Sequence, residues 1–308
     1  MSAEDAKRET AALFDAVAGD YDQLEVGFFS VFGRRLVELA GVAPGQRVLD
    51  VGCGRGAALF PAAAAVGASG HVLGIDLAPA MIDALAADVG ARRLTNVDVR
   101  VGDAEDPGVP DGSLDVVLGA LVLSFLTNVE RAVRAYRTAL RPGGLLAFTT
   151  LGPIDERWER IERALVPYLP AGDRTDDGEP PTDPLETPEG IASVLDWAGF
   201  ADATTREEVY PVRFSSPEVW EAWTWTTGMR AFWESIAPEH RDAARDEALR
   251  VVASLGDPDG GATCPYRVRY TLARRPRPQP AEAARRDTPR SPWIGSPGGT
   301  NREGLSGT

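Results

Sequence analysis

Three aspartates stand at the ends of successive apolar segments: Asp50, Asp76 and Asp103. The first lies in the run 48–56, VLDVGCGRG, where closely spaced glycines follow apolar residues. Glycine lets the backbone turn sharply after a strand and approach a ligand that side chains would exclude. Ligands of open sheets with parallel strands bind at the carboxyl ends of those strands. The pattern therefore predicts a site for a nucleotide-like cofactor.

The charge of Asp50 distinguishes two classes of cofactor. Gly52, Gly54 and Ala57 also satisfy the dinucleotide-binding pattern G-x-G-x-x-G/A, so glycine spacing alone leaves both classes open. A buried carboxylate two residues before the first glycine would repel the pyrophosphate of a dinucleotide. S-adenosylmethionine has no phosphate and carries an ammonium group and a sulfonium cation, which the carboxylate attracts. The charge favours S-adenosylmethionine.

The other two aspartates suit the rest of this cofactor. Asp76 lies 26 residues after Asp50 and can accept hydrogen bonds from both ribose hydroxyls. Asp103 follows the next apolar segment and can accept a hydrogen bond from the exocyclic amine of adenine. All three aspartates at successive strand ends indicate one common site.

The elements that would position these residues alternate in type. Five short apolar runs, separated by helix-length segments, are predicted as strands: 48–51, 71–75, 97–101, 114–118 and 145–149. Two more strands are expected at 204–214 and 266–272, where apolar and polar residues alternate as in half-exposed edge strands. The alternation predicts an α/β fold, a Rossmann-like, mostly parallel sheet of seven strands with helices on both faces.

Three helix starts are marked by capping residues. Thr127 stands three residues before Glu130, which is capping-box spacing. Thr187 and Ser216 are each followed by proline and glutamate, as at the start of a helix. We expect one domain, 1–273, with an N-terminal helical lid at 1–44 and a helical insertion at 216–256 between the last two strands. The Pro-, Arg- and Gly-rich tail, 274–308, is expected to be disordered.

The composition of the chain limits which substrates it can bind and where in the cell it is expected to act. The net charge of −14 argues against a nucleic-acid substrate, because phosphate binding needs clustered Lys and Arg. No run approaches the ~20 apolar residues of a membrane span, and the first ten residues are charged where a signal peptide would become apolar. We therefore expect a cytoplasmic protein. Cys53 and Cys264 are too far apart to indicate a disulfide framework or a metal site.

Several segments match one known family. They are Phe14-Asp15, Tyr21-Asp22, VLDVGCGRG at 48–56, GIDLAPAM at 74–81, GDAED at 102–106, LDVVLGALVLSFL at 114–126 and LRPGG at 140–144. Through them the chain resembles the ubiquinone/menaquinone-biosynthesis type of class I S-adenosylmethionine-dependent methyltransferases, a group that also methylates many natural products. The resemblance covers residues 21–150 and implies the same fold, cofactor and activity, methyl transfer (EC 2.1.1).

The resemblance also implies roles for individual residues. Gly52 and Gly54, with Cys53 between them, would pass beneath the methionine part of the cofactor, and Tyr21 would close over that end as a candidate catalytic residue. The other implied contacts are Asp76 with the ribose, Leu77 and Met81 with the adenine face, Asp103 and Ala104 with the adenine edge, and Gly119 and Ala120 with the sulfonium side.

Methyl transfer from a sulfonium depends on alignment and on exclusion of water more than on a nucleophilic residue. A neutral hydroxyl acceptor still needs a base, and the chain has only two histidines. His71 opens a strand and is expected to be structural, whereas His240 lies in the helical insertion and is the candidate base. A carboxylate or enolate acceptor would need no base.

The insertion is rich in aromatic residues, with four tryptophans between residues 220 and 233. One helical face cannot bury all of them, so some should face a cavity. The expected acceptor-binding residues are Trp220, Trp223, Trp225, Met229, Phe232 and Trp233. They predict a largely apolar or aromatic acceptor pocket.

The sequence thus predicts a cytoplasmic methyltransferase, a monomer or homodimer, that acts on a small natural-product-like acceptor of secondary metabolism. One alternative is a methyltransferase fold that catalyses a cyclisation or rearrangement with the cofactor as scaffold. A non-catalytic binding protein is the other.

Overall fold

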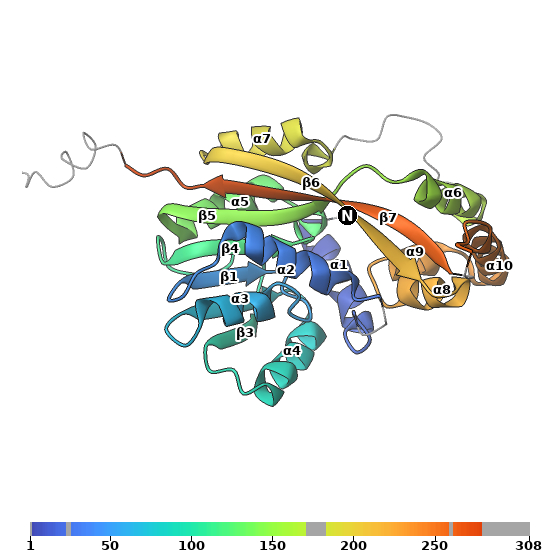
Figure 1. Ribbon diagram of the computed structural model, residues 1–308, viewed down its shortest axis with the longest axis horizontal. Coiled ribbons are helices and arrows are strands. Elements are labelled where there is room, and N and C mark those ends of the chain that lie inside the picture. The colour runs from blue at the N-terminus through green and yellow to red at the C-terminus, as the bar shows by residue number, and fades with distance from the viewer. Residues whose placement is uncertain (1, 23–25, 171–182, 259–260, 279–308) are drawn as a thin grey trace, which may run out of the picture. The chain divides into compact units, whose positions relative to one another are not determined.

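The computed structural model describes residues 2–22, 26–170, 183–258 and 261–278, and in these residues seven strands form one sheet (Figure 1). The strands are β1 (Arg47–Val51), β2 (His71–Asp76), β3 (Val97–Val101), β4 (Leu114–Ala120), β5 (Leu140–Leu151), β6 (Ala201–Phe214) and β7 (Ala262–Arg274). Their order across the sheet is β3-β2-β1-β4-β5-β7-β6. Strands β1 to β5 are parallel to one another, and β7 is antiparallel to both β5 and β6. The predicted Rossmann-like, mostly parallel sheet is confirmed.

Helices cover both faces of this sheet (Figure 1). They are α1 (Ala3–Val17), α2 (Phe28–Ala40), α3 (Leu59–Val66), α4 (Pro79–Ala91), α5 (Val129–Ala139), α6 (Glu156–Leu165), α7 (Pro188–Trp197), α8 (Pro217–Trp225), α9 (Arg230–Ser235) and α10 (Pro238–Ser254), with short 3-10 turns η1 (Leu123–Phe125), η2 (Val166–Tyr168) and η3 (Pro184–Glu186). Helices α2, α3 and α4 share one cluster of buried apolar side chains. Helices α5 and α7 contribute to a second cluster, together with Leu49 and Val51 of β1.

Strand β7 lies in the interior of the sheet, so its prediction as an edge strand is wrong. β6 pairs with it along its whole length and is itself the edge. The polar residues that suggested an exposed edge meet one another across the two strands. The hydroxyls of Thr205 and Thr271 are 3.0 Å apart, and Glu207 lies 3.3 Å from Arg269.

Two of the three predicted helix caps are confirmed. The side chains of Thr187 and Ser216 accept hydrogen bonds from the first turns of α7 and α8. The Thr127 capping box is wrong, because Asn128 caps α5 and accepts a hydrogen bond from its backbone at 2.8 Å. The Thr127 hydroxyl donates to Glu105 instead, at 2.7 Å. The Thr127 hydroxyl therefore binds the buried carboxylate of Glu105 in another loop and does not cap the helix.

The two helices of the predicted N-terminal lid, 1–44, differ in their packing. Helix α2 belongs to the core, with Phe32 and Leu36 fully buried. Helix α1 buries only Val17 and contacts α4 at the carboxyl edge of the sheet. Of the two helices, only α1 covers the carboxyl edge of the sheet.

The chain after β5 places a helical layer at one end of β6 and β7. Helices α8, α9 and α10 lie in the predicted insertion, 216–256, and Figure 1 shows them beside α6. The fold continues past the predicted boundary at Ala273, because Arg274 ends β7 and the Arg275 backbone N–H donates to the Gly144 carbonyl at 2.9 Å. The predicted disordered tail thus begins too early, and most of it, 279–308, lies outside the described residues.

A glycine fixes how closely α2 approaches the turn after β1. A Cβ atom on Gly33 would lie 2.3 Å from the carbonyl carbon and oxygen of Ala57. Gly33→Ala is therefore expected to lower the free energy of unfolding by about 1–3 kcal/mol, through overpacking against backbone. Gly90→Ala in α4 is the control. No atom lies within 4 Å of its Cβ position, so a gain of about 0.4–1 kcal/mol is expected. Urea unfolding measures both, and a Gly33→Ala variant as stable as the parent would contradict this packing.

Candidate active site

A cavity of about 940 Å³ lies at the carboxyl ends of β1 to β5. Each of these strands, or the loop that follows it, contributes to the lining, with Gly52, Asp76, Asp103, Ala120 and Thr150 as examples. One part of the wall comes from the predicted cofactor residues, and we call it the cofactor end. Another part comes from α6, α8 and β7, and we call it the acceptor end. The two parts belong to one continuous cavity.

The glycine turn after β1 approaches the cavity with its backbone. Gly52 has a φ of +59°, and a Cβ atom there would lie 2.2 Å from Cγ2 of Val122. The Gly54 N–H donates to Oδ2 of Asp76 at 2.8 Å, and the Cys53 N–H donates to the Ile75 carbonyl at 3.0 Å. The neighbouring strand β2 therefore holds the turn in place. Only a residue without a side chain fits at position 52.

Asp50 is the most deeply buried acidic group of the site, with 1% of its surface exposed. Neither carboxylate oxygen accepts a well-formed hydrogen bond among the described residues, although the Leu59 backbone N–H is close enough to lower the pKa of Asp50. Burial, and next the charge of Asp76, raise the pKa of Asp50 to about 8. With Cys53, it lines a smaller cavity of about 370 Å³ behind the glycine turn, which shares Gly52 and Gly54 with the large one. Such a group favours a cation nearby.

Asp76 faces the large cavity at the end of β2. Its Oδ1 accepts a hydrogen bond from the Ala78 N–H at 3.0 Å, and its Oδ2 accepts the one from Gly54. Burial raises its pKa even though these backbone donors lower it. Each oxygen keeps a second lone pair, so the fixed carboxylate can accept further hydrogen bonds from a diol. Leu77 and Met81 line the cavity beside it.

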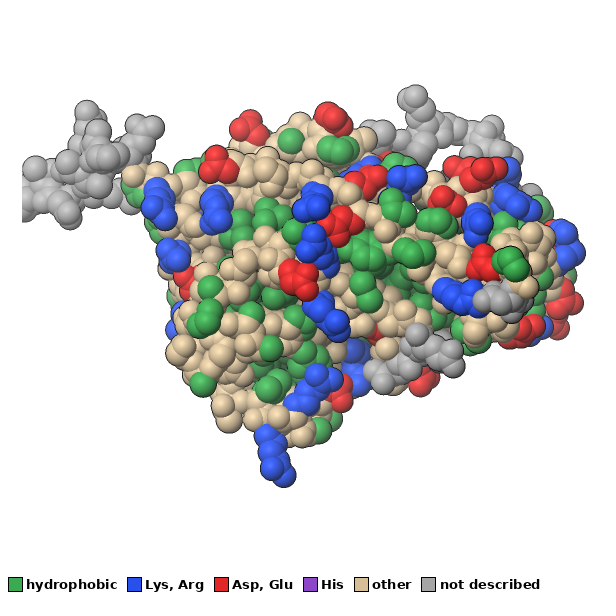
Figure 2. Space-filling view, in the orientation of Figure 1, with side chains coloured by type: hydrophobic (Ala, Val, Ile, Leu, Met, Phe, Trp, Pro, Cys, Tyr) green, Lys and Arg blue, Asp and Glu red, His purple; other side chains and the backbone are tan. Residues whose placement is uncertain are grey.

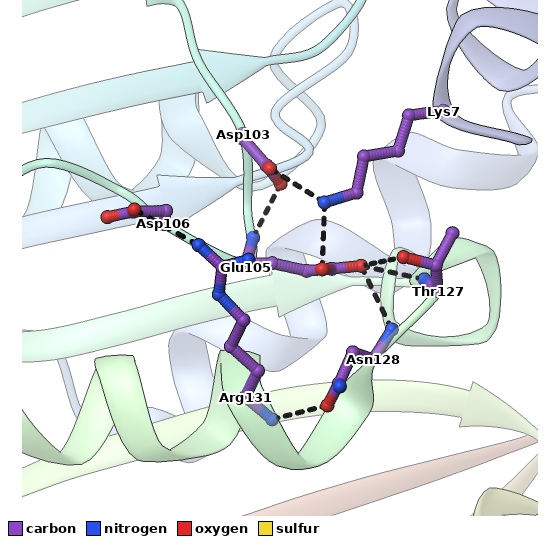
Figure 3. Close-up of polar contacts among 7 residues, drawn as sticks. All are labelled: Lys7, Asp103, Glu105, Asp106, Thr127, Asn128 and Arg131. Atoms are coloured by element: carbon purple, nitrogen blue, oxygen red, sulfur yellow. Dashed lines mark hydrogen bonds and ion pairs between the residues drawn. The ribbon is translucent and has the colours of Figure 1, made fainter. Parts of the chain in front are cut away.

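Asp103 belongs to a charged network that the sequence did not reveal (Figure 3). Nζ of Lys7, on α1, lies 2.8 Å from Oδ2 of Asp103 and 2.8 Å from Oε2 of Glu105. The other Glu105 oxygen accepts from the Thr127 N–H and hydroxyl, both at 2.7 Å, and from the Asn128 N–H at 3.0 Å. One buried carboxylate thus joins α1 to the loops after β3 and β4.

The pKa values of Lys7 and Glu105 are shifted toward their charged forms. Burial lowers the pKa of Lys7, but its two carboxylate partners outweigh this and raise it. Burial likewise raises the pKa of Glu105, and Lys7, Thr127 and Asn128 reverse the shift. Lys7 is the only lysine in the chain, and this is the one feature of the sequence that distinguishes it.

The remaining cofactor predictions divide between the cavity and its surroundings. Ala104 and Ala120 line the cavity, but Gly119 does not, because the side chains of Leu123 and Val122 cover it. Tyr21 lines the cavity and stacks on Phe29, with ring centroids 4.6 Å apart. Burial, followed by the nearby Asp22 and Asp76, raises the pKa of Tyr21 far above its usual value. The Tyr21 side chain is therefore neutral in the cavity wall.

Of the six predicted acceptor-binding residues, Trp223 and Met229 line the cavity. Trp220 and Trp233 belong to the core, because α8 and α9 turn them toward each other at a ring distance of 6.3 Å. Trp225 stacks on Trp233 at 5.9 Å, and Phe232 packs against the same ring, so neither reaches the cavity. The prediction is wrong for these four residues.

Residues from other elements complete the acceptor end. Trp158 of α6 and Tyr266 of β7 line it, with ring centroids 4.8 Å apart, and Thr150 adds a hydroxyl. Sequence reasoning missed them, because strands and helices distant along the chain bring them together. Arg267 and Glu162 also lie in the lining.

His240 is exposed on α10 and does not line the cavity, so its prediction as the base is wrong. The helix turns it toward solvent. His71 lies 3.1 Å from Asp98 at the opposite end of β2 from Asp76, which fits a structural role. No histidine among the described residues lines the cavity.

The residues at the cofactor end of the cavity fit S-adenosylmethionine. Asp76, Asp103 and Glu105 line this part of the large cavity together with Lys7, and Asp50 lines the smaller cavity beside it, whose wall also holds Arg34, Arg55 and Arg92. The acidic groups of the large cavity suit a cationic cofactor without phosphate, and the glycine turn leaves room for it. Where the cofactor binds, Asp76 would hold its ribose and Leu77 with Met81 its adenine.

Comparison with known proteins agrees with this fit. A methyltransferase-domain family model matches residues 49–148. The chain is 37% identical over 276 residues to nocamycin O-methyltransferase of Saccharothrix syringae, covering 85% of this chain and 97% of that protein. It is 45% identical over 144 residues to aklanonic acid methyltransferase DauC of Streptomyces sp. strain C5, covering 47% and 66%. The solved [4+2]-cyclase SpnF superposes with a TM-score of 0.50 at 22% identity, covering 81% of each chain, which shows a shared fold.

The chain belongs to the class I S-adenosylmethionine-dependent methyltransferases. Its cofactor is S-adenosylmethionine, and its substrate is a small molecule. Within the described residues, no helix is long and apolar enough to span a membrane.

Lys7 is predicted to hold α1 over the cofactor end. Lys7→Met leaves the buried Glu105 without its cation, so the free energy of unfolding should fall by about 1–3 kcal/mol. S-adenosylmethionine should bind about fivefold more weakly, roughly 1 kcal/mol, because the cover loses this attachment. Arg8→Met on the same helix is the control. Its pair with Asp5 is exposed, so neither quantity should change. Calorimetric titration measures the affinities, and equal values for the two variants would remove Lys7 from this role.

Proposed function

We propose that this enzyme transfers the methyl group of S-adenosylmethionine to an oxygen of a small, largely apolar or aromatic natural product. The observation that carries the proposal is the continuous cavity, in which an acidic cofactor end opens onto an aromatic acceptor end. A flat apolar ring system would bury its surface against Trp158, Trp223 and Tyr266.

The relatives support both the class of acceptor and the atom methylated. Nocamycin O-methyltransferase is named for transfer to oxygen, and aklanonic acid methyltransferase for an acidic substrate. An acid or an enol ionises without a strong base. This agrees with a described lining that contains no histidine and with a Tyr21 whose pKa is raised.

The protein's own residues would contribute binding, alignment and exclusion of water. The bound cofactor supplies an electrophilic methyl group on a sulfonium. The aromatic walls would orient the acceptor toward it, and α1 would close the cofactor end through Lys7. We infer no nucleophilic residue in this mechanism.

We further infer that the enzyme acts in the cytoplasm, as a monomer or a homodimer, and not on nucleic acid. The net charge of −14 supports the inference that the substrate is not a nucleic acid. On the face in Figure 2, several basic side chains stand beside acidic ones. Ion pairs on the protein include Arg35–Glu208 at 2.8 Å.

Two tryptophans of α8 give a matched test of the acceptor end. Trp223 lines the cavity and Trp225 does not. Trp223→Leu should lower kcat/KM for the acceptor at least tenfold, about 1.4 kcal/mol, and Trp225→Leu should stay close to the parent enzyme. The dissociation constant of S-adenosylmethionine should hardly change in either variant.

Release of S-adenosylhomocysteine with a panel of aromatic acids and enols provides the assay. One equivalent should form per methylated product. If an acceptor is converted while no S-adenosylhomocysteine forms, the enzyme catalyses a cyclisation or rearrangement and the proposed function is wrong.

A further inference from the structure

The large cavity is bordered by apolar side chains that are open to solvent. Seven large apolar side chains among the described residues are 44–53% exposed, and three of them line this cavity: Phe125, Leu151 and Ile154. We call these three residues the apolar rim. Single exposed apolar residues are common on soluble proteins, but several of them at one cavity indicate a binding surface.

The segments that carry the apolar rim leave neighbouring strands at the same place. Ala120 of β4 pairs with Thr149 of β5, and the Leu121 N–H donates to the Thr149 hydroxyl at 2.9 Å. Phe125 follows β4 in η1, which contacts β5, and Leu151 is the last residue of β5. The apolar rim therefore lies where two adjacent parallel strands end.

Packing within the turn before α6 leaves Ile154 open. Ile154 stands directly before Asp155, the cap of α6, at a position whose apolar side chain often packs on the fourth residue of the helix. Here that fourth residue is Glu159, which pairs with Arg163 at 3.2 Å. Ile154 thus lacks the usual local partner.

Leu151 and Phe125 are exposed where the cover of their own segments ends. Thr150 is 2% exposed, whereas Leu151, the next residue, is 46% exposed. Phe125 packs edge-on against Phe14 of α1, with ring centroids 5.1 Å apart, and still leaves much of its surface open. Three segments therefore present apolar surface to the same cavity.

Two charged side chains beside the apolar rim have other partners. Asp155 accepts a hydrogen bond from the Arg157 N–H at 3.0 Å, and Arg267 lies 3.4 Å from Glu207. The side chains of the rim themselves carry no hydrogen-bonding group, and two of the three are aliphatic. A ligand group that covers them should therefore be apolar and need not be flat.

We propose that the apolar rim binds an alkyl or acyl substituent of the acceptor. The substrate class is then an aromatic ring system that carries an apolar chain. The aromatic walls would hold the ring and the rim would hold the chain, because both line one continuous cavity. Covering exposed apolar side chains is favourable in proportion to the area removed from water. This inference rests on the proposed function and names its substrate class.

A series of 6-alkoxy-2-naphthoates tests the apolar rim, because its members share an aromatic acid and differ only in the length of the chain. Calorimetric titration uses the full protein saturated with S-adenosylhomocysteine. The parent protein should bind 6-hexyloxy-2-naphthoate at least about tenfold more tightly than 6-methoxy-2-naphthoate.

Leu151→Ser and Ile154→Ser should each reduce this gain about threefold. Affinity for the methoxy compound should stay unchanged, because its short chain does not reach the rim. Val31→Ser on α2 is the control, since Val31 is 45% exposed but does not line the cavity. Substitutions of exposed side chains seldom prevent folding, and Phe125→Ser gives a third, independent test. A smaller gain in the rim variants alone supports the proposal.

No gain in the parent protein overturns the proposal, as does a gain that all variants retain. A parent dimer that Ile154→Ser dissociates in analytical ultracentrifugation also overturns it, because the rim would then be a subunit interface. The S-adenosylhomocysteine assay with the same naphthoates separates this failure from a failure of the proposed function. An enzyme that methylates them without a chain-length gain remains a methyltransferase, and its rim binds no chain.

Discussion

The cofactor end depends on a carboxylate that β1 carries into the protein interior. Asp50 is buried and accepts no well-formed hydrogen bond among the described residues, and Asp76 adds a like charge nearby. Burial of an unpaired charge is costly, so the folded protein without cofactor holds this group largely protonated at neutral pH. A cation relieves the cost, and a phosphate would increase it. The same constraint explains why a glycine turn compatible with dinucleotides serves a sulfonium cofactor.

The cover over this end is held by charged contacts as well as by an apolar cluster around Val17 and Phe14. Helix α1 buries only Val17, and its attachments include Lys7 to Glu105 and the Asp15 carboxylate, which accepts from the Ala80 N–H at 2.7 Å. The acceptor end is built differently, from aromatic side chains of α6, α8 and β7. Charged side chains thus dominate the predicted cofactor end of the cavity, and aromatic side chains dominate the predicted acceptor end.

Local sequence patterns predicted the sheet and the aspartates of the cofactor end, because strand periodicity and glycine turns are properties of short segments. They could not say which side of α8 faces a cavity, so Trp220 and Trp233 were assigned to the acceptor although they pack together in the core. Neither could they place His240, whose helix turns it to solvent. Lys7 and Trp158 were missed because their partners lie about a hundred residues away or in other elements.

The central claim is that the charge of Asp50 selects a cationic cofactor. Because the pKa of Asp50 is about 8 in the free protein, its carboxyl group carries a proton near pH 6.5. A bound cation lowers this pKa, so binding must release the proton. Titration calorimetry with S-adenosylmethionine, in buffers of different ionisation enthalpy, measures this release directly. The account predicts about one proton released per cofactor bound in the parent protein, less with the uncharged thioether S-adenosylhomocysteine, and none from this group in Asp50→Asn. Equal proton release from the parent and from Asp50→Asn would contradict it.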